Sequence, residues 1–548
     1  MHKPQCQNII SALSLFKINI SDELNLSQHR GNLHNDSRKI QSGDIFCAIR
    51  GTVQDGGKYI ASAIEAGACL IINECSTPEE HGKMSWSDST NSVAIVSFYL
   101  LNQALFSLAK SYYQNPQDKM RMIGITGTNG KTSTTQLVAQ LLSNLSNEDN
   151  NCKEIEKHQC AIIGTNGAGT FEKLTPLANT TPSATELHQL FYRFERKRIR
   201  YVAMEVSSHA LEQHRVNGEL FNTALFTNLS RDHLDYHGTM ENYAKAKREL
   251  FIGNDKQVAI LNGDDDCAKQ WLLNWPVEQE LWLYGKEQYI TKQSKYVLAD
   301  NVKHHVSGVE FTLKTHLGDI DIVSPLLGDF NIDNLLAAIA VTMVEMAQTR
   351  RISEEFLATL AKTVARITPI AGRMEAISQS GLATTVVDYA HTPDALEKAL
   401  IACKAHCQGE LYVIFGCGGD RDKGKRPLMA EAAEKYADHL VITNDNPRTE
   451  SSQAIVEDMI SGIAGIDQTR LKVILDRKKA TIETLQQAME TDIVLLAGKG
   501  HEDYIIIGDE TLSYDERDVV AKYYQAKLNS QENSNTSKDK LNNNGVTK

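Results

Sequence analysis

The chain has 548 residues, of which 41% are apolar and 23% charged, and its 69 acidic and 57 basic side chains give a net charge of −12. This length exceeds a single hydrophobic core, so we expect several domains. The acidic balance disfavours a nucleic-acid partner, and no apolar run approaches the roughly 20 residues that span a bilayer. The ten cysteines include no C-x-x-C pair, which favours reduced thiols in a cytoplasmic protein over a zinc site or a disulfide framework.

The first 98 residues contain short β-rich runs separated by polar turns, which predict a small α/β domain over residues 1–98. Strands are expected at 44–50, 68–73 and 93–97. The amphipathic segment 101–113 is predicted to be a connecting helix.

From residue 121 the pattern changes to repeated strand, loop and helix, which predicts a parallel sheet in a central domain over residues 99–367. Its strands are expected at 121–126, 161–164, 201–206, 223–227 and 257–262. Residues 145–160 are polar and aperiodic, and they predict a surface insertion. Alternating runs at 295–323 predict an antiparallel appendage, and a helix over residues 334–346 closes the domain.

A second α/β series over residues 368–528 predicts a Rossmann-like, doubly wound C-terminal domain. Its strands are expected near 384–389, 411–415, 440–443, 472–475 and 493–497. Residues 529–548 are rich in Asn, Ser and Lys and nearly devoid of large apolar side chains, so we expect a disordered tail. The predicted fold is therefore α/β, with three domains and a tail.

The glycine loop after the first central strand is the strongest functional signal in the sequence. In this loop Gly127 and Gly130 would let backbone N–H groups approach phosphate oxygens. Lys131 would place a positive charge on the outer phosphates, and Thr132 would offer a hydroxyl to Mg²⁺. Ile125 stands where the common phosphate loop has its first glycine, which argues against ordinary GTPases and motor ATPases. We interpret the segment as an ATP site; the alternative is a glycine turn that happens to precede a lysine.

Polar clusters follow the predicted strands of both series. Ligands of open parallel sheets bind beyond the carboxyl ends of the strands, so side chains at these ends gather at one edge. Besides the phosphate loop, the clusters occupy residues 205–209 and 227–233 in the central domain and 388–391, 416–421, 444–448 and 498–502 in the C-terminal domain. Two such edges predict a cleft between domains in which two substrates meet.

Ten motifs, taken in order, resemble those of the Mur ligase family. They are DSR at 36–38, GTNGKT at 127–132, NTT at 179–181, MEVSSH at 204–209, SRDHLDYHG at 230–238, FNIDN at 330–334, GRME at 372–375, DYAHTPD at 388–394, DNPR at 445–448 and GKGHE at 498–502. The resemblance implies an ATP-dependent ligase that forms an amide through an acyl phosphate. Within the family, the motifs resemble those of the enzymes that add the third residue of the peptidoglycan stem to a UDP-sugar dipeptide.

For ATP, the resemblance implies contacts from the phosphate loop and from later segments. The implied residues are Gly127, Thr128, Asn129, Gly130, Lys131, Thr132, Ser133, Asn331, Asn334, Arg373 and Asp388. For the UDP-sugar dipeptide, it places one group of residues against uridine and another against the muramoyl-dipeptide. The first group is Asn35, Ser37, Thr52, Val53 and Gln54, and the second is Asn179, Thr180, Thr181, Ser207, Gln213 and Arg215.

Acyl-phosphate chemistry needs cations, because two anions must approach and charge develops on the phosphoryl oxygens. Mg²⁺ held by Thr132 and Glu205 would supply part of this charge. The resemblance implies a second metal ion at Glu205 and His233, and a CO₂-derived carbamate on Lys247 that sits beside Mg²⁺. Without the resemblance, Lys247 would read as a solvated helix lysine, like its neighbour Lys245. The expected catalytic residues are Lys131, Glu205, His233 and Lys247.

The amino-acid substrate is inferred from the DNPR cluster. A distal carboxylate on the substrate calls for a guanidinium, which Arg448 and Arg421 provide, while Glu502 and Asp445 could hold the neighbouring ammonium. Lysine has no distal carboxylate, and the lysine-adding relatives lack the arginine, so we expect meso-2,6-diaminopimelate. The predicted binding set is Arg421, Asp445, Asn446, Pro447, Arg448, Gly498 and Glu502.

Other interpretations stay open on the sequence alone. Lysine addition, a different Mur step and folate polyglutamylation use similar phosphate loops. A non-catalytic nucleotide-dependent regulator would belong to a different class, and a simple phosphate-loop kinase would not need the second α/β series. We expect a monomeric cytoplasmic ligase with small-molecule substrates, without nucleic-acid binding or membrane insertion.

Overall fold

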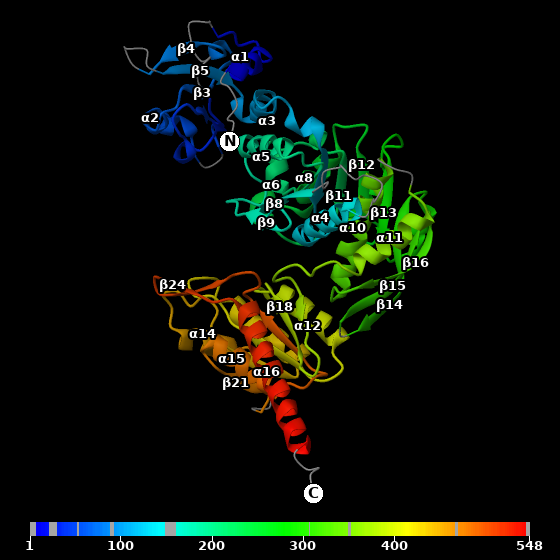
Figure 1. The fold of residues 1–548 in the computed structure, drawn as a ribbon. Coiled ribbons are helices and arrows are strands. Elements are labelled where there is room, and N and C mark those ends of the chain that lie inside the picture. Colours follow the sequence, from blue (N-terminus) through cyan, green and yellow to red (C-terminus); the bar gives the residue numbers. More distant parts are fainter. Residues whose placement is uncertain are drawn as a thin grey trace. The chain divides into compact units, whose positions relative to one another are not determined.

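The computed structural model describes residues 7–20, 30–51, 54–87, 93–147, 160–305, 307–348, 352–465 and 469–543, so the predicted insertion at 145–160 lies almost entirely outside it. The chain divides into two compact units, each of which is described by itself (Figure 1). The first unit comprises Met1–Leu298, Thr315–Gly318 and Asn334–Leu360, and the second comprises Ala299–Lys314, Asp319–Asp333 and Ala361–Lys548.

A five-stranded sheet in the order β1-β2-β3-β5-β4 begins the first unit. Its strands are β1 (Leu33–His34), β2 (Ile45–Ala48), β3 (Leu70–Cys75), β4 (Met84–Trp86) and β5 (Ala94–Tyr99). All neighbours are parallel except β4, which is antiparallel to β5. The helices of this region are α1 (Gln7–Ser14), α2 (Ile60–Glu65) and α3 (Leu101–Tyr112). The three predicted strands and the connecting helix are confirmed.

The central sheet of the first unit has the order β13-β12-β11-β6-β10-β7-β8-β9. Its strands are β6 (Arg121–Thr126), β7 (Cys160–Gly164), β8 (Gly167–Thr170), β9 (Lys173–Thr175), β10 (Tyr201–Glu205), β11 (Thr223–Phe226), β12 (Val258–Asn262) and β13 (Leu281–Gly285). The neighbours from β13 to β7 are parallel, and β8 and β9 are antiparallel additions. The five predicted strands are confirmed, whereas β8, β9 and β13 were not predicted.

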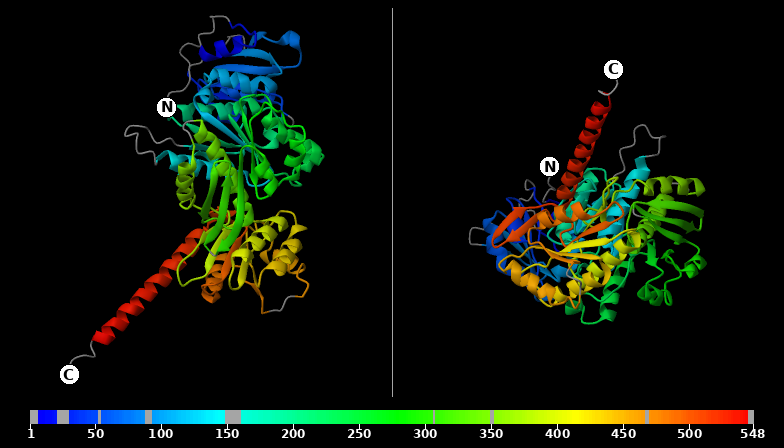
Figure 2. Two further views of the ribbon diagram at one scale, coloured as in Figure 1. Left: turned by 90° about the vertical axis from the view of Figure 1, so that its right-hand side faces the viewer. Right: turned by 90° about the horizontal axis from the view of Figure 1, so that it is seen from below.

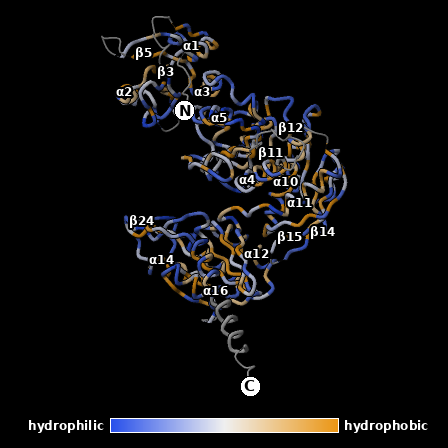
Figure 3. The backbone as a smooth tube through the Cα atoms, in the orientation of Figure 1, coloured by the Kyte–Doolittle hydropathy of each residue, from blue (hydrophilic) through white to orange (hydrophobic). Residues whose placement is uncertain are grey.

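The central helices are α4 (Lys131–Asn147), α5 (Ala184–Arg196), α6 (Ser208–Glu212), α7 (Leu234–His237), α8 (Met240–Arg248), α9 (Asp266–Leu272), α10 (Asp329–Ala347) and α11 (Glu354–Val364). Among the described residues, α10 is the one helix long and apolar enough to cross a bilayer, and 83% of its apolar window is buried. Figure 3 shows hydrophobic residues along α10 and the strands near it. We therefore interpret α10 as a core helix, and it extends the helix predicted at 334–346.

Three consecutive neighbouring strands, β14 (Tyr296–His305), β15 (Gly308–Thr315) and β16 (Gly318–Ser324), correspond to the predicted appendage. The start of β14 pairs in parallel with β13. The links between β14, β15 and β16 are too short for crossovers, so these strands form hairpins.

The main sheet of the second unit has the order β17-β18-β22-β19-β20-β21. Its strands are β17 (Glu375–Ile377), β18 (Thr384–Asp388), β19 (Leu411–Phe415), β20 (His439–Ile442), β21 (Leu471–Val473) and β22 (Ile493–Ala497). All are parallel except β17. Neighbouring residues such as Val413 and Ile414 belong to different hydrophobic clusters, so both faces of the sheet are covered. The predicted doubly wound arrangement and its five strands are confirmed.

The covering helices are α12 (Pro393–His406), α13 (Lys425–Tyr436), α14 (Ser452–Ile460), α15 (Arg477–Gln487) and α16 (Glu516–Asn543). Figure 2 shows α16 as one continuous helix in red. Its printed bounds overlap the segment from residue 529 that is predicted to be disordered, and that tail stays a prediction. Val520 and Tyr524 pack in the core, and the following polar residues contain no Pro or Gly that would end the helix. An unpredicted hairpin of β23 (Tyr504–Ile507) and β24 (Glu510–Ser513) precedes α16.

Candidate functional site

The phosphate loop connects β6 to α4, as the sequence predicts. Gly127 has a φ of +149°, and a Cβ there would lie 1.9 Å from Thr227 Oγ1. Gly130 has a φ of +83°, and a Cβ there would lie 2.2 Å from Asn334 Oδ1. Both glycines are therefore required by backbone conformation and by close packing. Lys131 Nζ donates to the carbonyls of Gly127 and Thr128, each at 2.8 Å.

The rest of the loop packs on the segment after β11. The backbone N–H of Thr128 donates to Asn228 O at 2.8 Å, and that of Asn129 donates to Asn228 Oδ1 at 2.9 Å. Thr132 and Ser133 begin α4 and are partly buried. The predicted phosphate-loop residues therefore lie together around the end of β6.

Glu205, at the end of β10, lies beside this loop. Its side chain accepts hydrogen bonds from Thr132 Oγ1 at 2.9 Å and from the backbone N–H of Thr165 at 2.9 Å. Gly164 makes room for it, because a Cβ there would lie 2.1 Å from Glu205 Oε1. Burial raises the pKa of Glu205 and lowers the pKa of Lys131. Both pKa shifts indicate that a buried charge lacks a full partner within the protein. A phosphate would compensate Lys131, and a cation would compensate Glu205.

These residues suit a hard cation by their chemistry. A buried carboxylate and an adjacent hydroxyl offer oxygen ligands of the kind that Mg²⁺ prefers. Among the residues that the structure describes, no three His, Cys, Asp or Glu side chains form a metal site by themselves. Mg²⁺ usually takes only one or two carboxylates and completes its shell with water and substrate phosphates.

Lys247 is buried on α8, not solvated. Its ammonium nitrogen lies 2.8 Å from Gly127 O and 4.3 Å from the centre of the Tyr243 ring. Burial, with Lys131 nearby, lowers the pKa of Lys247 to about 6. Lys245 on the same helix is exposed. Of these two lysines, Lys247 is the one that reaches the phosphate loop.

His233 is half exposed and has a left-handed φ of +52°. Its ring lies 5.0 Å from that of His209 and 5.9 Å from that of Tyr243, measured between centroids. His237 packs on Tyr243 and is held by Ser208 Oγ at 2.9 Å. An aromatic cluster, which the sequence analysis did not identify, therefore connects His233 to the helix that carries Lys247.

A cleft of about 1160 Å³ opens between the N-terminal and central sheets of the first unit. The predicted residues that line it are Asn35, Ser37, Gln54, Asn179, Gln213 and Arg215. Thr52 and Val53 lie outside the described residues. The cleft thus brings together most of the residues predicted for the uridine end and half of those predicted for the dipeptide.

The other dipeptide candidates lie toward Glu205. Thr181 Oγ1 donates to Glu205 O at 2.9 Å, and Thr180 Oγ1 lies 3.1 Å from Thr165 Oγ1. Ser207 caps α6 through Ala210 N. Arg215 Nη1 donates to Thr181 O at 3.2 Å, so the two groups of candidates are connected.

The later ATP candidates lie in different surroundings. Asn334 Oδ1 accepts a hydrogen bond from Thr134 Oγ1 on the phosphate-loop helix at 3.3 Å, and Asn331 Nδ2 donates to Leu327 O at 2.9 Å. In the second unit, the Asp388 carboxylate accepts from the backbone N–H groups of Met374 and Ala390, at 2.7 and 2.8 Å. Burial raises the pKa of Asp388. The Arg373 guanidinium lies 4.9 Å from the Tyr389 ring centre.

Arg448 is held in a strained, well-defined position. Its φ is +51°, its N–H donates to Ile506 O at 3.1 Å, and its carbonyl accepts from Gly508 N at 2.7 Å. The β23–β24 hairpin therefore fixes its backbone. Its Nη1 donates to Gly419 O at 2.9 Å, while Nε and Nη2 make no hydrogen bond with any described residue. The guanidinium is thus left with a free edge.

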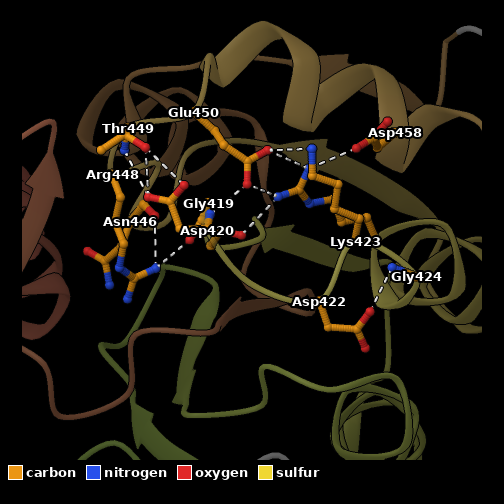
Figure 4. Close-up of polar contacts among 12 residues, drawn as sticks. Gly419, Asp420, Asp422, Lys423, Gly424, Asn446, Arg448, Thr449, Glu450 and Asp458 are labelled. Atoms are coloured by element: carbon orange, nitrogen blue, oxygen red, sulfur yellow. Dashed lines mark hydrogen bonds and ion pairs between the residues drawn. The ribbon is translucent and has the colours of Figure 1, made fainter.

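Hydrogen bonds connect the loop that contains Asp420 to the loop that contains Thr449 and Glu450, as Figure 4 shows. The carboxylate of Asp420 accepts from Thr449 Oγ1 at 2.9 Å, and Asp420 N donates to Glu450 Oε1. Arg426 is fully buried and pairs with Glu450 at 2.9 Å and with Asp458 at 2.8 Å, which lowers the pKa of Glu450 to about 2. Arg421 is exposed on the same loop.

The acidic members of the predicted amino-acid site already contact a lysine of the protein. Lys499 Nζ donates to Glu502 at 2.7 Å, to Asn446 at 3.1 Å and to Asp445 at 3.5 Å. Gly498, with a φ of +112°, and Pro447 lie in the same two loops. The predicted set is brought together, and Lys499 is an additional member that the sequence analysis left unassigned.

Two of the site residues that were not predicted, Thr165 and Lys499, had a usable signal in the sequence. Thr165 directly follows the end of β7, and ligands of parallel sheets bind at the carboxyl ends of the strands. Lys499 stands inside a cluster that had been singled out. Arg426 and Tyr243 had none, because each lies within a helix and acts through tertiary contacts.

Family models match three parts of the chain. The model of the Mur ligase family catalytic domain matches residues 31–113, the Mur ligase middle domain matches 125–342, and the Mur ligase glutamate ligase domain matches 372–500. A UDP-N-acetylmuramoyl-L-alanyl-D-glutamate–2,6-diaminopimelate ligase of Haemophilus influenzae is 40% identical over 494 residues, which cover 90% of this chain and 96% of the relative. The chain belongs to the Mur ligase family. The predicted three-domain α/β fold is confirmed.

Solved structures of Mur ligases and their relatives share this fold. A structure of a UDP-N-acetylmuramoyl-L-alanyl-D-glutamate–2,6-diaminopimelate ligase has a TM-score of 0.67 and 32% identity, covering 96% of this chain and all of the other. A folylpolyglutamate synthase of Mycobacterium tuberculosis has a TM-score of 0.53 and 17% identity, covering 72% of this chain and 92% of the other. The second likeness concerns the fold alone, so the fold does not by itself decide the substrate.

We expect Gly130→Ala to weaken ATP binding at least tenfold, because the added Cβ would collide with Asn334 and distort the loop that faces the phosphates. Titration with ATP would measure this. Gly381→Ala is the matched control, since Gly381 has a similar φ of +78° but no atom within 4 Å of an added Cβ. Equal losses in both variants would show that backbone strain, and not the phosphate loop, causes the effect.

Proposed function

We propose that the chain is an ATP-dependent amide ligase that adds meso-2,6-diaminopimelate to UDP-N-acetylmuramoyl-L-alanyl-D-glutamate. The product would serve the cytoplasmic synthesis of peptidoglycan precursors, and the chain would act as a monomer on small-molecule substrates. The relatives described above carry this reaction in their names. The arrangement of Arg448 supports diaminopimelate as the amino-acid substrate.

The free edge of Arg448 is the observation that favours diaminopimelate over lysine. Nε and Nη2 form the side of a guanidinium that grips a carboxylate with two parallel hydrogen bonds. Because the hairpin and Gly419 O already hold Arg448, little conformational entropy is lost when a carboxylate binds. Lysine would leave these donors unpaired, at a cost of a few kcal/mol.

The first unit supplies the residues for carboxylate activation. The acceptor carboxylate attacks the γ-phosphorus of ATP, the bond from that phosphorus to the bridging oxygen breaks, and ADP leaves. The amine of the amino acid then attacks the acyl carbon, the C–O bond to phosphate breaks, and the amine loses a proton. Lys131 lies where it would offset the negative charge of the phosphoryl oxygens.

Thr132, Glu205, His233 and a carbamate on Lys247 would hold Mg²⁺. When bound, the metal would neutralise charge between the nucleotide and the acceptor carboxylate. A neutral amine reacts with CO₂, and the lowered pKa of Lys247 supports this modification. Asn331, Asn334, Arg373 and Asp388 are proposed for the remaining ATP contacts. The cleft lined by Ser37, Asn179 and Arg215 would hold the UDP-sugar dipeptide.

The reaction is tested with purified protein, ATP, Mg²⁺, the UDP-sugar dipeptide and either diaminopimelate or lysine. We expect product mass corresponding to diaminopimelate addition and release of ADP and phosphate. Comparable turnover of lysine would contradict the assigned specificity. ATP hydrolysis without any ligated product would contradict the ligase itself.

Arg448→Ala should raise the KM for diaminopimelate about 100-fold, because the substrate carboxylate loses a charge-assisted bidentate contact. The dissociation constant of ATP should change less than about twofold. Steady-state kinetics and nucleotide titration measure the two effects. Arg196→Ala is the control, since Arg196 is an exposed arginine on α5. Loss of ATP affinity in parallel with the amino-acid effect would argue against a substrate contact.

Lys247→Ala should abolish turnover, whereas Lys245→Ala should leave it near the wild-type rate. Because the pKa of Lys247 is about 6, its amine is mainly neutral at pH 7.5 and mainly charged below pH 6. Wild-type activity in CO₂-depleted buffer should therefore recover on adding bicarbonate at pH 7.5, and much less at pH 5.5. Full activity of Lys247→Ala, or no response to bicarbonate, would refute the carbamate.

A further inference from the structure

Lys499 lies at the centre of the loops proposed to bind the amino acid. Its side chain is fully buried, and its ammonium donates to Glu502, Asn446 and Asp445. An ammonium has three N–H donors, so these acceptors use all of them. The ring of Tyr504 lies 5.1 Å from Nζ and covers the lysine from the hairpin side. Lys499 is therefore a fixed internal cation.

The contacts of Lys499 fix the orientation of two substrate-facing side chains. Glu502 Oε2 also accepts from Asn446 Nδ2 at 3.2 Å, and Asn446 Oδ1 also accepts from Ile506 N at 2.9 Å. Lys499 thus connects the loop after β20, the loop after β22 and the β23–β24 hairpin. Without it, the Glu502 carboxylate would keep a single described side-chain donor, Asn446, and could rotate.

Lys499 also sets the charge of this cluster. Asp445 and Glu502 both lie within 3.5 Å of its nitrogen, and together they carry two negative charges. With the lysine, the cluster keeps one net negative charge, which matches one substrate ammonium. Without it, the cluster would carry two negative charges, which one substrate ammonium cannot balance.

We infer that Lys499 is a positioning residue that determines recognition of the amino-acid substrate by holding Glu502 and Asn446 in their binding orientation. The inference rests on the proposed function, since it takes diaminopimelate as the substrate. Lys499 does not itself touch the substrate, because its nitrogen is buried and its donors are all used.

The test is steady-state kinetics of Lys499→Met, which keeps an unbranched side chain one atom shorter and removes its charge. The KM for diaminopimelate should rise about 10- to 100-fold, because charge-assisted hydrogen bonds are lost. The KM values for ATP and for the UDP-sugar dipeptide should stay within about twofold. Lys479→Met is the matched control, since Lys479 is an exposed lysine of the same unit that pairs with Glu483 on its own helix. It should change none of the three constants.

A double-mutant cycle with Glu502→Gln separates positioning from general damage to the fold. Lys499→Met alone buries uncompensated carboxylates and is the variant most prone to misfold. The double variant removes one of these carboxylates, so it provides a folded protein if the single variant fails. If Lys499 acts through Glu502, the KM of the double variant should equal that of Glu502→Gln within about twofold.

The outcomes distinguish this inference from the proposed function. A wild-type protein without diaminopimelate-dependent turnover would overturn the proposed function, and the inference with it. A wild-type protein with that turnover, but an unchanged KM in Lys499→Met, would overturn the inference alone. Equal increases in all three KM values, or multiplied effects in the double variant, would also overturn it.

Discussion

The burial of charge at the carboxyl ends of parallel strands is the constraint on which the functional parts of this protein depend. A parallel sheet covered on both faces leaves only its edges for polar ligands, so charged side chains concentrate there. In water-poor surroundings each charge needs a partner from the protein or from a ligand. The two units of the chain meet this requirement in different ways.

In the first unit the charges at the strand ends remain incompletely compensated. Lys131 bonds to carbonyl groups, Glu205 bonds to hydroxyl and amide donors, and Lys247 contacts a carbonyl and an aromatic ring. The pKa values of all three shift toward the neutral forms because of burial. Such groups gain most when an oppositely charged ligand arrives, which is the behaviour required of a site that binds a nucleotide and a metal ion.

Among the described residues of the second unit, three buried cations are paired with carboxylates of the protein itself. Arg426 pairs with Glu450, Lys499 pairs with Glu502, and Arg477 pairs with Glu516. Arg477 also donates to Ala497 O at 2.7 Å and to Asn444 O at 3.3 Å, at the ends of the strands that lead into the two amino-acid loops. Buried pairs of this kind contribute more to a defined geometry than to net stability. The free edge of Arg448 is therefore presented by a framework whose buried cations are already paired with carboxylates.

The sequence predicted the strands that are apolar on both faces, because long β-branched runs between polar turns have few alternatives. It did not predict β13, β8 and β9, or the β23–β24 hairpin. The hairpin strands are only partly buried or exposed, and pairing with each other, not hydrophobicity, decides their structure. Site residues were predictable where a motif followed a strand.

Residues of the amino-acid site could be predicted from the sequence where their own chemistry matches the substrate. Arg448 and Glu502 carry a charge pattern that a zwitterionic substrate needs, so their chemistry is visible in the sequence. Lys499 stands between them in the same motif, but a lysine reads as solvated until its burial is known. Only the structure shows that three acceptors surround its nitrogen. Lys499 is bonded by side chains of the protein, whereas Arg448 keeps donors free for a ligand. This difference depends on tertiary packing, so the sequence alone does not reveal it.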